Sequence, residues 1–116
     1  MKNSKYYVCP SCGNVTMCTG NATVSCCGRK LEELKPKKAK PEEKLTVEEV
    51  EDDWYITSQH PMTKGHHISF VAFATGDKVQ MIKQYPEWNL QVRILKRGHG
   101  MLIWHCIKDG LFYQLI

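Results

Sequence analysis

Four cysteines near the amino end constrain this 116-residue chain more than any other feature of its sequence. Cys9 and Cys12 are separated by two residues, and Cys26 and Cys27 are adjacent. A two-residue spacer lets both sulfurs of a tight turn converge on one ion at about 2.3 Å. Adjacent cysteines bridge each other only with strain. The spacing therefore predicts a tetrahedral four-thiolate site for iron or zinc, with free structural thiols as the alternative.

A fifth cysteine, Cys18, lies between these two pairs. We expect Cys18 to be a spare thiol near the site. The alternative is that Cys18 replaces Cys26 or Cys27 as a ligand. The chain has six cysteines and no apolar segment behind its basic first residues. We therefore expect no signal peptide and no membrane span, and a cytoplasmic, reducing environment in which cysteines bind metal.

The net charge of +4 is unevenly distributed. Residues 1–41 carry +6, residues 42–53 carry −6 and residues 54–116 carry +4. The basic stretch from Arg29 to Lys40 has no aromatic residue between its cations, so it is a poor platform for nucleic acid. We interpret this stretch as a solvated linker, with the docking of an acidic partner as the alternative.

These patterns divide the chain into a four-cysteine module at 1–35, a charged linker at 36–53 and a β-domain at 54–116. In the module, strands are predicted at Tyr6–Val8, from Thr16 where the chain returns, and at Thr23–Ser25. Part of the acidic run at 42–53 is expected to add an edge strand. Alternation at period two predicts further strands: 54–59, 67–74, 78–85, 87–95, 101–107 and 111–116. The fold class is mainly β, a small four-cysteine metal ribbon followed by an antiparallel immunoglobulin-like β-sandwich.

Three details of the sandwich follow from the same patterns. Asp109-Gly110 predicts a type I′ hairpin turn. Trp54, Trp88 and Trp104 are expected to be core aromatics. Met62 and Met81 are expected to fill gaps in the core.

A second group of residues that can bind metal lies in the β-domain: His60-Pro61-Met62, then His66, then Cys106-Ile107-Lys108-Asp109-Gly110. Together with Cys9-Pro10-Ser11-Cys12 and Cys26-Cys27-Gly28, these residues resemble the desulfoferrodoxin / superoxide reductase family over nearly the whole chain. The resemblance implies a desulforedoxin-type module and a sandwich that holds a mononuclear iron. In that family four imidazoles and one axial thiolate bind the iron, which reduces superoxide by one electron to hydrogen peroxide.

Carried over to this sequence, the resemblance assigns His60 and His66 to imidazole positions and Cys106 to the axial thiolate. Lys44 is then a candidate for attracting superoxide. Asp109 stands where the family has a histidine, and Leu45, or Glu43 in a shifted register, stands at the other histidine position. The set of His60, His66, Cys106 and Asp109 fits tetrahedral zinc, iron with open positions, or a vestige without metal.

The remaining histidines are expected to lie outside this set. His67 and His105 neighbour the expected ligands and should point to the opposite face of their strands. His99, in a loop flanked by glycines, is an outside candidate. Asp109 also suits a turn without any metal.

Three hypotheses follow. The first is a superoxide reductase-type iron protein with a rubredoxin-type electron donor and, as the resemblance implies, a homodimer paired through its small modules. The second is a non-catalytic electron-transfer or structural metal protein that uses only the four-cysteine site, with iron or zinc. The third, a zinc ribbon that binds nucleic acid through the basic segment, is the least favoured.

Overall fold

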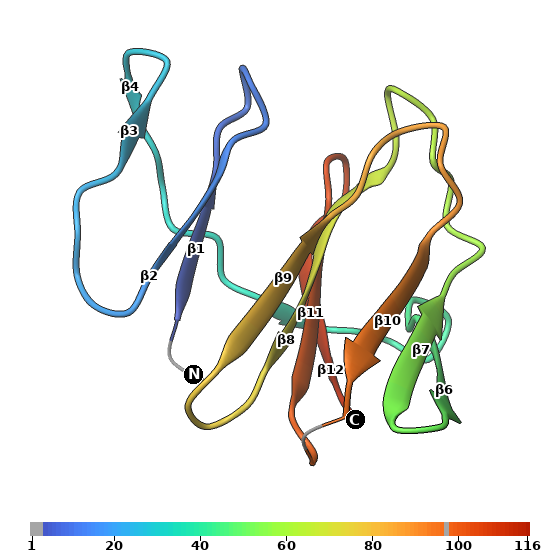
Figure 1. Ribbon diagram of the computed structural model, residues 1–116. Helices are drawn as coiled ribbons and strands as arrows, with labels where there is room; N and C mark the ends of the chain where they lie inside the picture. The colour runs from blue at the N-terminus through green and yellow to red at the C-terminus, as the bar shows by residue number, and fades with distance from the viewer. Residues whose placement is uncertain (1–3, 97) are drawn as a thin grey trace.

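The computed structural model describes residues 4–96 and 98–116, and these residues form strands and turns without any helix. Figure 1 shows a small module at the amino end, in blue and cyan, beside a larger two-sheet body. Since no helix is found among the described residues, none is available to cross a membrane. The mainly β fold class expected from the sequence is confirmed.

The amino-terminal module consists of two short hairpins. Strand β1 (Lys5–Val8) pairs antiparallel with β2 (Val15–Cys18), and β3 (Ser25–Cys26) pairs antiparallel with β4 (Arg29–Lys30). The strand predicted at Thr23–Ser25 thus begins only at Ser25. The hydrogen bonding of this hairpin continues one step beyond the assigned strands, since the N–H of Leu31 donates to the carbonyl of Val24 at 2.8 Å.

The body is a β-sandwich of a five-stranded and a three-stranded sheet, as expected. The first has the order β5-β12-β11-β8-β9 and the second the order β10-β7-β6. All pairs are antiparallel except β5 with β12. The strands are β5 (Lys37–Lys38), β6 (Thr46–Val50), β7 (Asp53–Thr57), β8 (Ile68–Ala74), β9 (Val79–Lys83), β10 (Gln91–Leu95), β11 (Met101–Cys106) and β12 (Gly110–Leu115).

Both faces of the five-stranded sheet are covered. Its inner face packs against the three-stranded sheet, with Val71 and Phe73 of β8 in the shared core. Its outer face packs against the module, where Tyr6 stacks on Phe70 with the ring centroids 6.0 Å apart. Every residue of β8 is therefore buried, which explains a strand sequence that is apolar almost throughout.

The segment at 36–53, expected to be a charged linker, is part of the sandwich. It contributes β5 and β6 and buries the side chains of Ala39 and Leu45. Some of its acids form ion pairs with cations in or directly after β10, with Lys96 Nζ 2.8 Å from Glu49 and Arg93 3.0 Å from Asp53. The edge strand expected from the acidic run is confirmed as β6.

Three expectations about the sandwich are wrong in detail. Trp88 is 67 % exposed and packs beside Tyr85, because β10 begins only at Gln91 and leaves Trp88 in the preceding turn. Met81 is also exposed. Cys106 pairs with Gly110, so three residues, and not a two-residue type I′ turn, connect β11 to β12. Gly110 is needed there because its φ is +103°.

Candidate metal centres

The four cysteines of the module meet at the ends of its two hairpins. Cys9 and Cys12 follow β1, and Cys26 and Cys27 lie at the turn between β3 and β4. Their sulfur atoms all lie within 4.8 Å of one another, with Cys12 and Cys26 at 3.5 Å and Cys26 and Cys27 at 3.9 Å. Four thiolates bound to one tetrahedral ion at about 2.3 Å stand about 3.8 Å apart. The arrangement fits one metal ion.

Backbone geometry explains how two adjacent cysteines face the same point. Consecutive side chains of a strand point to opposite sides, but Cys27 has a φ of +55° and Gly28 a φ of +75°. This left-handed turn brings the sulfur of Cys27 back beside that of Cys26. On the other side, the N–H of Gly13 donates to the carbonyl of Cys9 at 2.8 Å and closes the first turn.

The environment of the four-cysteine group shifts the pKa values of the Cys9 and Cys27 thiols in opposite directions. Backbone N–H groups, that of Cys12 above all, lower the pKa of Cys9 to about 6. Hydrogen bonds with the sulfur atoms of Cys12 and Cys9 raise the pKa of Cys27 to about 12, because they favour the protonated thiol. A bound cation favours the thiolate instead, so metal binding is coupled to deprotonation. All six cysteines are free thiols.

Cys18 lies outside this group. It ends β2 and is half-buried against the small apolar cluster of Tyr7, Cys9 and Leu31. This position agrees with the expectation of a spare thiol.

The second group combines donors from three places in the sandwich. His60 and His66 lie between β7 and β8, Cys106 ends β11 and Asp109 lies in the following turn. One donor atom from each lies within 4.8 Å of all the others. Asp109 Oδ2 is 3.1 Å from His66 Nε2, 3.5 Å from Cys106 Sγ and 3.9 Å from His60 Nε2. The structure therefore assembles two imidazoles, one thiol and one carboxylate.

His60 carries an observation that favours a metal ion. Its Nδ1 lies 2.7 Å from the carbonyl of Pro61, so Nδ1 holds the proton and donates it, leaving Nε2 with a free lone pair. That Nε2 is buried and has no hydrogen-bond partner among the described residues. A buried polar atom without a partner is costly, and a cation at the centre of the group would satisfy it. The four residues thus fit a metal ion.

Local contacts hold the other donors in place. Thr63 and His66 exchange backbone hydrogen bonds of 3.0 and 3.2 Å, which shape the turn before β8. The hydrogen bond from His66 holds the pKa of Asp109 below its usual value. Burial raises the pKa of the Cys106 thiol, opposed by the backbone N–H groups of Lys108 and Asp109. Lys37 Nζ donates to the carbonyl of Asp109 at 2.9 Å.

A cavity of about 470 Å³ opens onto this group and is lined by Glu43, Lys44, His60 and Asp109, among others. Lys44 therefore faces the same space as two of the candidate ligands. Leu45, in contrast, is buried in the core, and its N–H donates to Gln114 Oε1 at 2.8 Å. Leu45, at one of the positions where the resemblance implies a histidine, has no side-chain atom that can bind metal. The group therefore contains only the imidazoles of His60 and His66.

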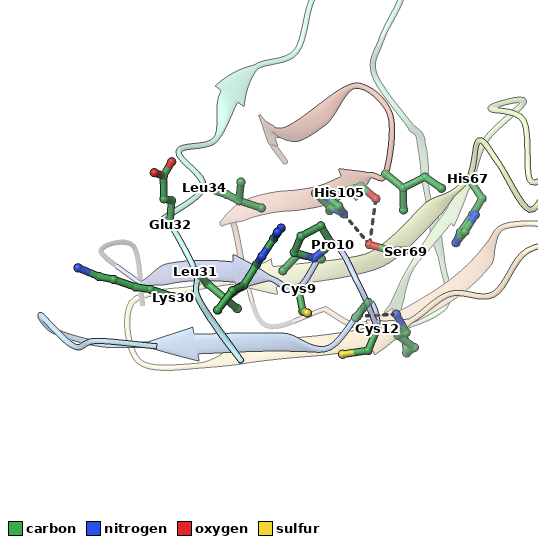
Figure 2. Close-up of a pocket in the computed structure, with 15 residues that line it drawn as sticks. Cys9, Pro10, Cys12, Lys30, Leu31, Glu32, Leu34, His67, Ser69 and His105 are labelled. Carbon is green, nitrogen blue, oxygen red and sulfur yellow. Dashed lines mark hydrogen bonds between the residues drawn. The ribbon is translucent and has the colours of Figure 1, made fainter. Parts of the chain in front are cut away.

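The other histidines lie elsewhere, as expected. His105 is buried on the reverse face of β11, and His99 Nδ1 lies 3.2 Å from the carbonyl of Ile116. His67 and His105 both line a second cavity of about 830 Å³ between the module and the sandwich. Figure 2 shows Ser69 joined to His105 in this cavity, with Cys9 and Pro10 nearby.

Two sets of contacts at the site were not anticipated from the sequence: the Ser69–His105 pair and the Lys37 contact to Asp109. Both depend on strand pairing between distant segments. No local motif marks either of them.

Comparison with solved structures identifies the fold. The superoxide reductase from Treponema pallidum aligns with a TM-score of 0.82 at 14% sequence identity, over 98% of this chain and 99% of that chain. A superoxide reductase from Nanoarchaeum equitans aligns with a TM-score of 0.44 at 21% identity, over 71% of this chain and 98% of that chain. No family model matches the chain, and no curated protein matches it in sequence.

The chain therefore has the superoxide reductase fold, from the four-cysteine module through the sandwich. The resemblance noted in the sequence is confirmed at the level of the fold. Similarity at 14% identity establishes this architecture, and the chemistry of the two centres must be argued from their own residues.

Proposed function

We propose that this protein is a two-centre iron protein that reduces superoxide by one electron to hydrogen peroxide in its sandwich domain. The observation that carries the proposal is the convergence of His60, His66, Cys106 and Asp109 beside a cavity that also contains Lys44. The four cysteines of the module would hold a second ion, iron in the cell or zinc after isolation.

Each residue of the sandwich centre has a definable part in this reaction. His60 Nε2, His66 Nε2, Cys106 Sγ and Asp109 Oδ2 would hold the ion, and Lys44 would attract the superoxide anion into the cavity. A ferrous ion bound there would supply the electron. Trp104 and Phe112 form an apolar part of the cavity wall. Superoxide takes up this electron and two protons to leave as hydrogen peroxide.

The charge of the centre supports a role for Lys44. One thiolate and one carboxylate neutralise a divalent cation, whereas a set of imidazoles with one thiolate leaves a net positive charge. With Asp109 as a ligand, the attraction for an anion must come from outside the ligand set. Lys44 is the lysine among the residues that line the cavity, which Glu42 and Glu43 also line, and we assign this attraction to it.

The proposal is tested by metal content and superoxide consumption of the full chain expressed with iron. We expect two metal ions per chain, and one per chain in Cys106→Ala. Superoxide should be consumed with stoichiometric formation of peroxide, and Lys44→Ala should slow this reaction, most strongly at low salt. Lys78→Ala, at an exposed turn away from the cavity, is the matched control. A wild-type protein whose sandwich holds no iron would contradict the proposal.

A second candidate function is a non-catalytic electron-transfer or structural metal protein that uses only the four-cysteine centre. The observation that favours it is the absence of two imidazoles from the described sandwich group, where Asp109 and Leu45 stand instead. This candidate predicts one metal ion per chain and no superoxide consumption. If the metal is iron, this candidate also predicts a reversible one-electron redox couple. If the metal is zinc, it predicts no redox couple.

We further propose a rubredoxin-type electron donor, a homodimer paired through the modules and a reducing compartment such as the cytoplasm. The six free thiols support the last of these. Sedimentation of the metal-loaded chain would test the dimer, and reduction of the oxidised protein by a reduced rubredoxin would test the donor.

A further inference from the structure

The strand β8 contains an irregularity directly beside the sandwich centre. Along most of its length β8 pairs with β11 in a regular antiparallel ladder that ends with Phe70 opposite His105. A regular ladder would then place Ser69 opposite Cys106. Cys106 instead pairs with Ile68, so Ser69 is one extra residue. This is a β-bulge, a feature that redirects the side chains beyond it.

The bulge changes which side chains reach the inner face of the sheet. Phe70, Ala72 and Ala74 lie on the outer face, and Val71 and Phe73 on the inner face. Strict alternation would continue with Ser69 inside and Ile68 outside. The structure shows the reverse, with Ile68 in the inner core and Ser69 in the outer cavity.

The same shift extends to the two adjacent histidines. His67 lines the outer cavity, and His66 places Nε2 3.1 Å from Asp109 in the sandwich centre. Without the extra residue, His67 would face inward and His66 outward, because a slip of one residue exchanges the faces of a strand. Cys106 is unaffected, since the bulge lies in β8 and not in β11.

Ser69 has the contacts needed to hold this bulge. Its Oγ lies 2.7 Å from His105 Nδ1 and 3.4 Å from the carbonyl oxygen of His105. Its own carbonyl accepts the N–H of Gln84 at 2.9 Å. The His105 ring is fixed in turn by stacking on Phe70, with the centroids 5.9 Å apart. Both partners are buried, with Ser69 3 % and His105 7 % exposed.

We propose that Ser69 is a positioning residue: its bulge, tied to His105, makes His66 and not His67 the histidine that faces the metal in the sandwich centre. The inference rests on the proposed metal centre. It adds that the bulge in β8 determines which of the two adjacent histidines is the metal ligand. Ser69 itself touches neither the metal nor the substrate.

The test reads the ligation state of each histidine in the full chain by ¹⁵N NMR of the imidazole nitrogens during titration with Zn²⁺. The four-cysteine centre contains no histidine, but His67 lines the same cavity as Cys9 and Cys12, so this centre is loaded with one equivalent of Zn²⁺ before the titration begins. In the wild type, zinc should shift the Nε2 signals of His60 and His66 and leave His67 unchanged. Failure of every histidine to respond would contradict the proposed metal centre. A response of His60 and His67 would contradict only the bulge inference.

Ser69→Ala removes the hydroxyl and should weaken zinc binding at His66 by about tenfold or more. Ala72→Gly is the matched control, since it loosens the same buried strand without touching the bulge and should leave this affinity near the wild-type value. Deletion of Ser69 removes the extra residue and should transfer the zinc-induced shift from His66 to His67. Wild-type affinity in Ser69→Ala would overturn the inference, even if the deletion variant does not fold.

Discussion

His105 shows how much of this molecule is decided by single buried side chains. Sequence alternation is sufficient to place the His105 side chain on the face of β11 that lies opposite the Cys106 side chain. The structure confirms that placement. What alternation does not give is its partner, because Ser69 reaches His105 only through a bulge in another strand. The residues closest in sequence to the ligands were therefore predictable, and the residues that support them were not.

A pH dependence of stability follows from this histidine. Burial, with contributions from Lys83 and His67, lowers the pKa of His105 from 6.5 to about 4. The folded protein therefore favours neutral His105. The resulting stabilisation is complete above pH 6.5 and is lost as the pH falls towards 4. We expect the free energy of unfolding to fall over this range by up to about 3 kcal/mol from this group.

Denaturant titrations of the wild type and His105→Gln between these pH values would measure the effect. The loss of stability on acidification should be smaller in His105→Gln, and both proteins are compared without metal, because the contact of His105 with Ser69 also supports the sandwich centre. His99→Gln, at an exposed loop, is the control and should follow the wild type. An equal loss in His105→Gln and the wild type would show that His105 does not remain neutral.

At the scale of the elements, β5 connects the module to the sandwich centre. Lys37 of this short strand donates to the carbonyl of Asp109 and places its ammonium 4.7 Å from the centre of the Phe112 ring. We expect Lys37→Ala to loosen the turn and to weaken metal binding at the sandwich centre about fivefold, as for the loss of one hydrogen bond of ordinary net strength. Calorimetric titration with Zn²⁺ would measure this change.

Lys38 provides a matched control for that measurement. It is the neighbouring residue of β5, is exposed and carries the same charge. Lys38→Ala should bind metal as the wild type does. If the two variants weakened binding equally, the effect would come from net charge and not from the contact with the turn.

A second element-scale prediction concerns the approach of β11 to the end of β8. A Cβ atom at Gly100 would lie 2.5 Å from the carbonyl oxygen of Ala74 and 2.9 Å from the ring of Phe73. We expect Gly100→Ala to lower the free energy of unfolding by about 1–3 kcal/mol through overpacking. Gly76→Ala, where a Cβ meets nothing within 4 Å, should change it little. Thermal unfolding of both variants would measure these two changes in stability.

The strands themselves were predictable to different degrees. The alternation of Leu90, Val92 and Ile94 correctly marks the buried face of β10. Extending the pattern back to Trp88 fails because the chain turns at Glu87, where φ is +70°. The charge of the segment at 36–53 wrongly predicts a linker, because ion pairs with Arg93 and Lys96, which are distant in sequence, offset part of its acidic charge.

At the scale of the whole molecule, we expect folding of the module to depend on its metal more than folding of the sandwich does. The module has two short hairpins and a small core, so metal binding should supply much of its folding free energy. We expect the double variant Cys9→Ser/Cys12→Ser to lose order in residues 5–30 while β7–β12 stay folded. Backbone NMR would show this as collapsed amide dispersion confined to the module.

The control for that experiment is Cys18→Ser, which removes a thiol from the same module without removing a proposed ligand. It should keep the module ordered. Unfolding of the sandwich together with the module in the double variant would contradict their independence. It would mean that the stack of Tyr6 on Phe70 is essential to the larger domain.

The turn that carries Asp109 has a consequence for how this centre can be altered. Paired strands hold the turn at both ends, and the side chain of Asp109 is 52 % exposed. Exchanging that one residue for another donor should therefore leave the scaffold intact. The chain becomes a convenient host in which the reactivity of different ligand combinations can be compared within an unchanged frame.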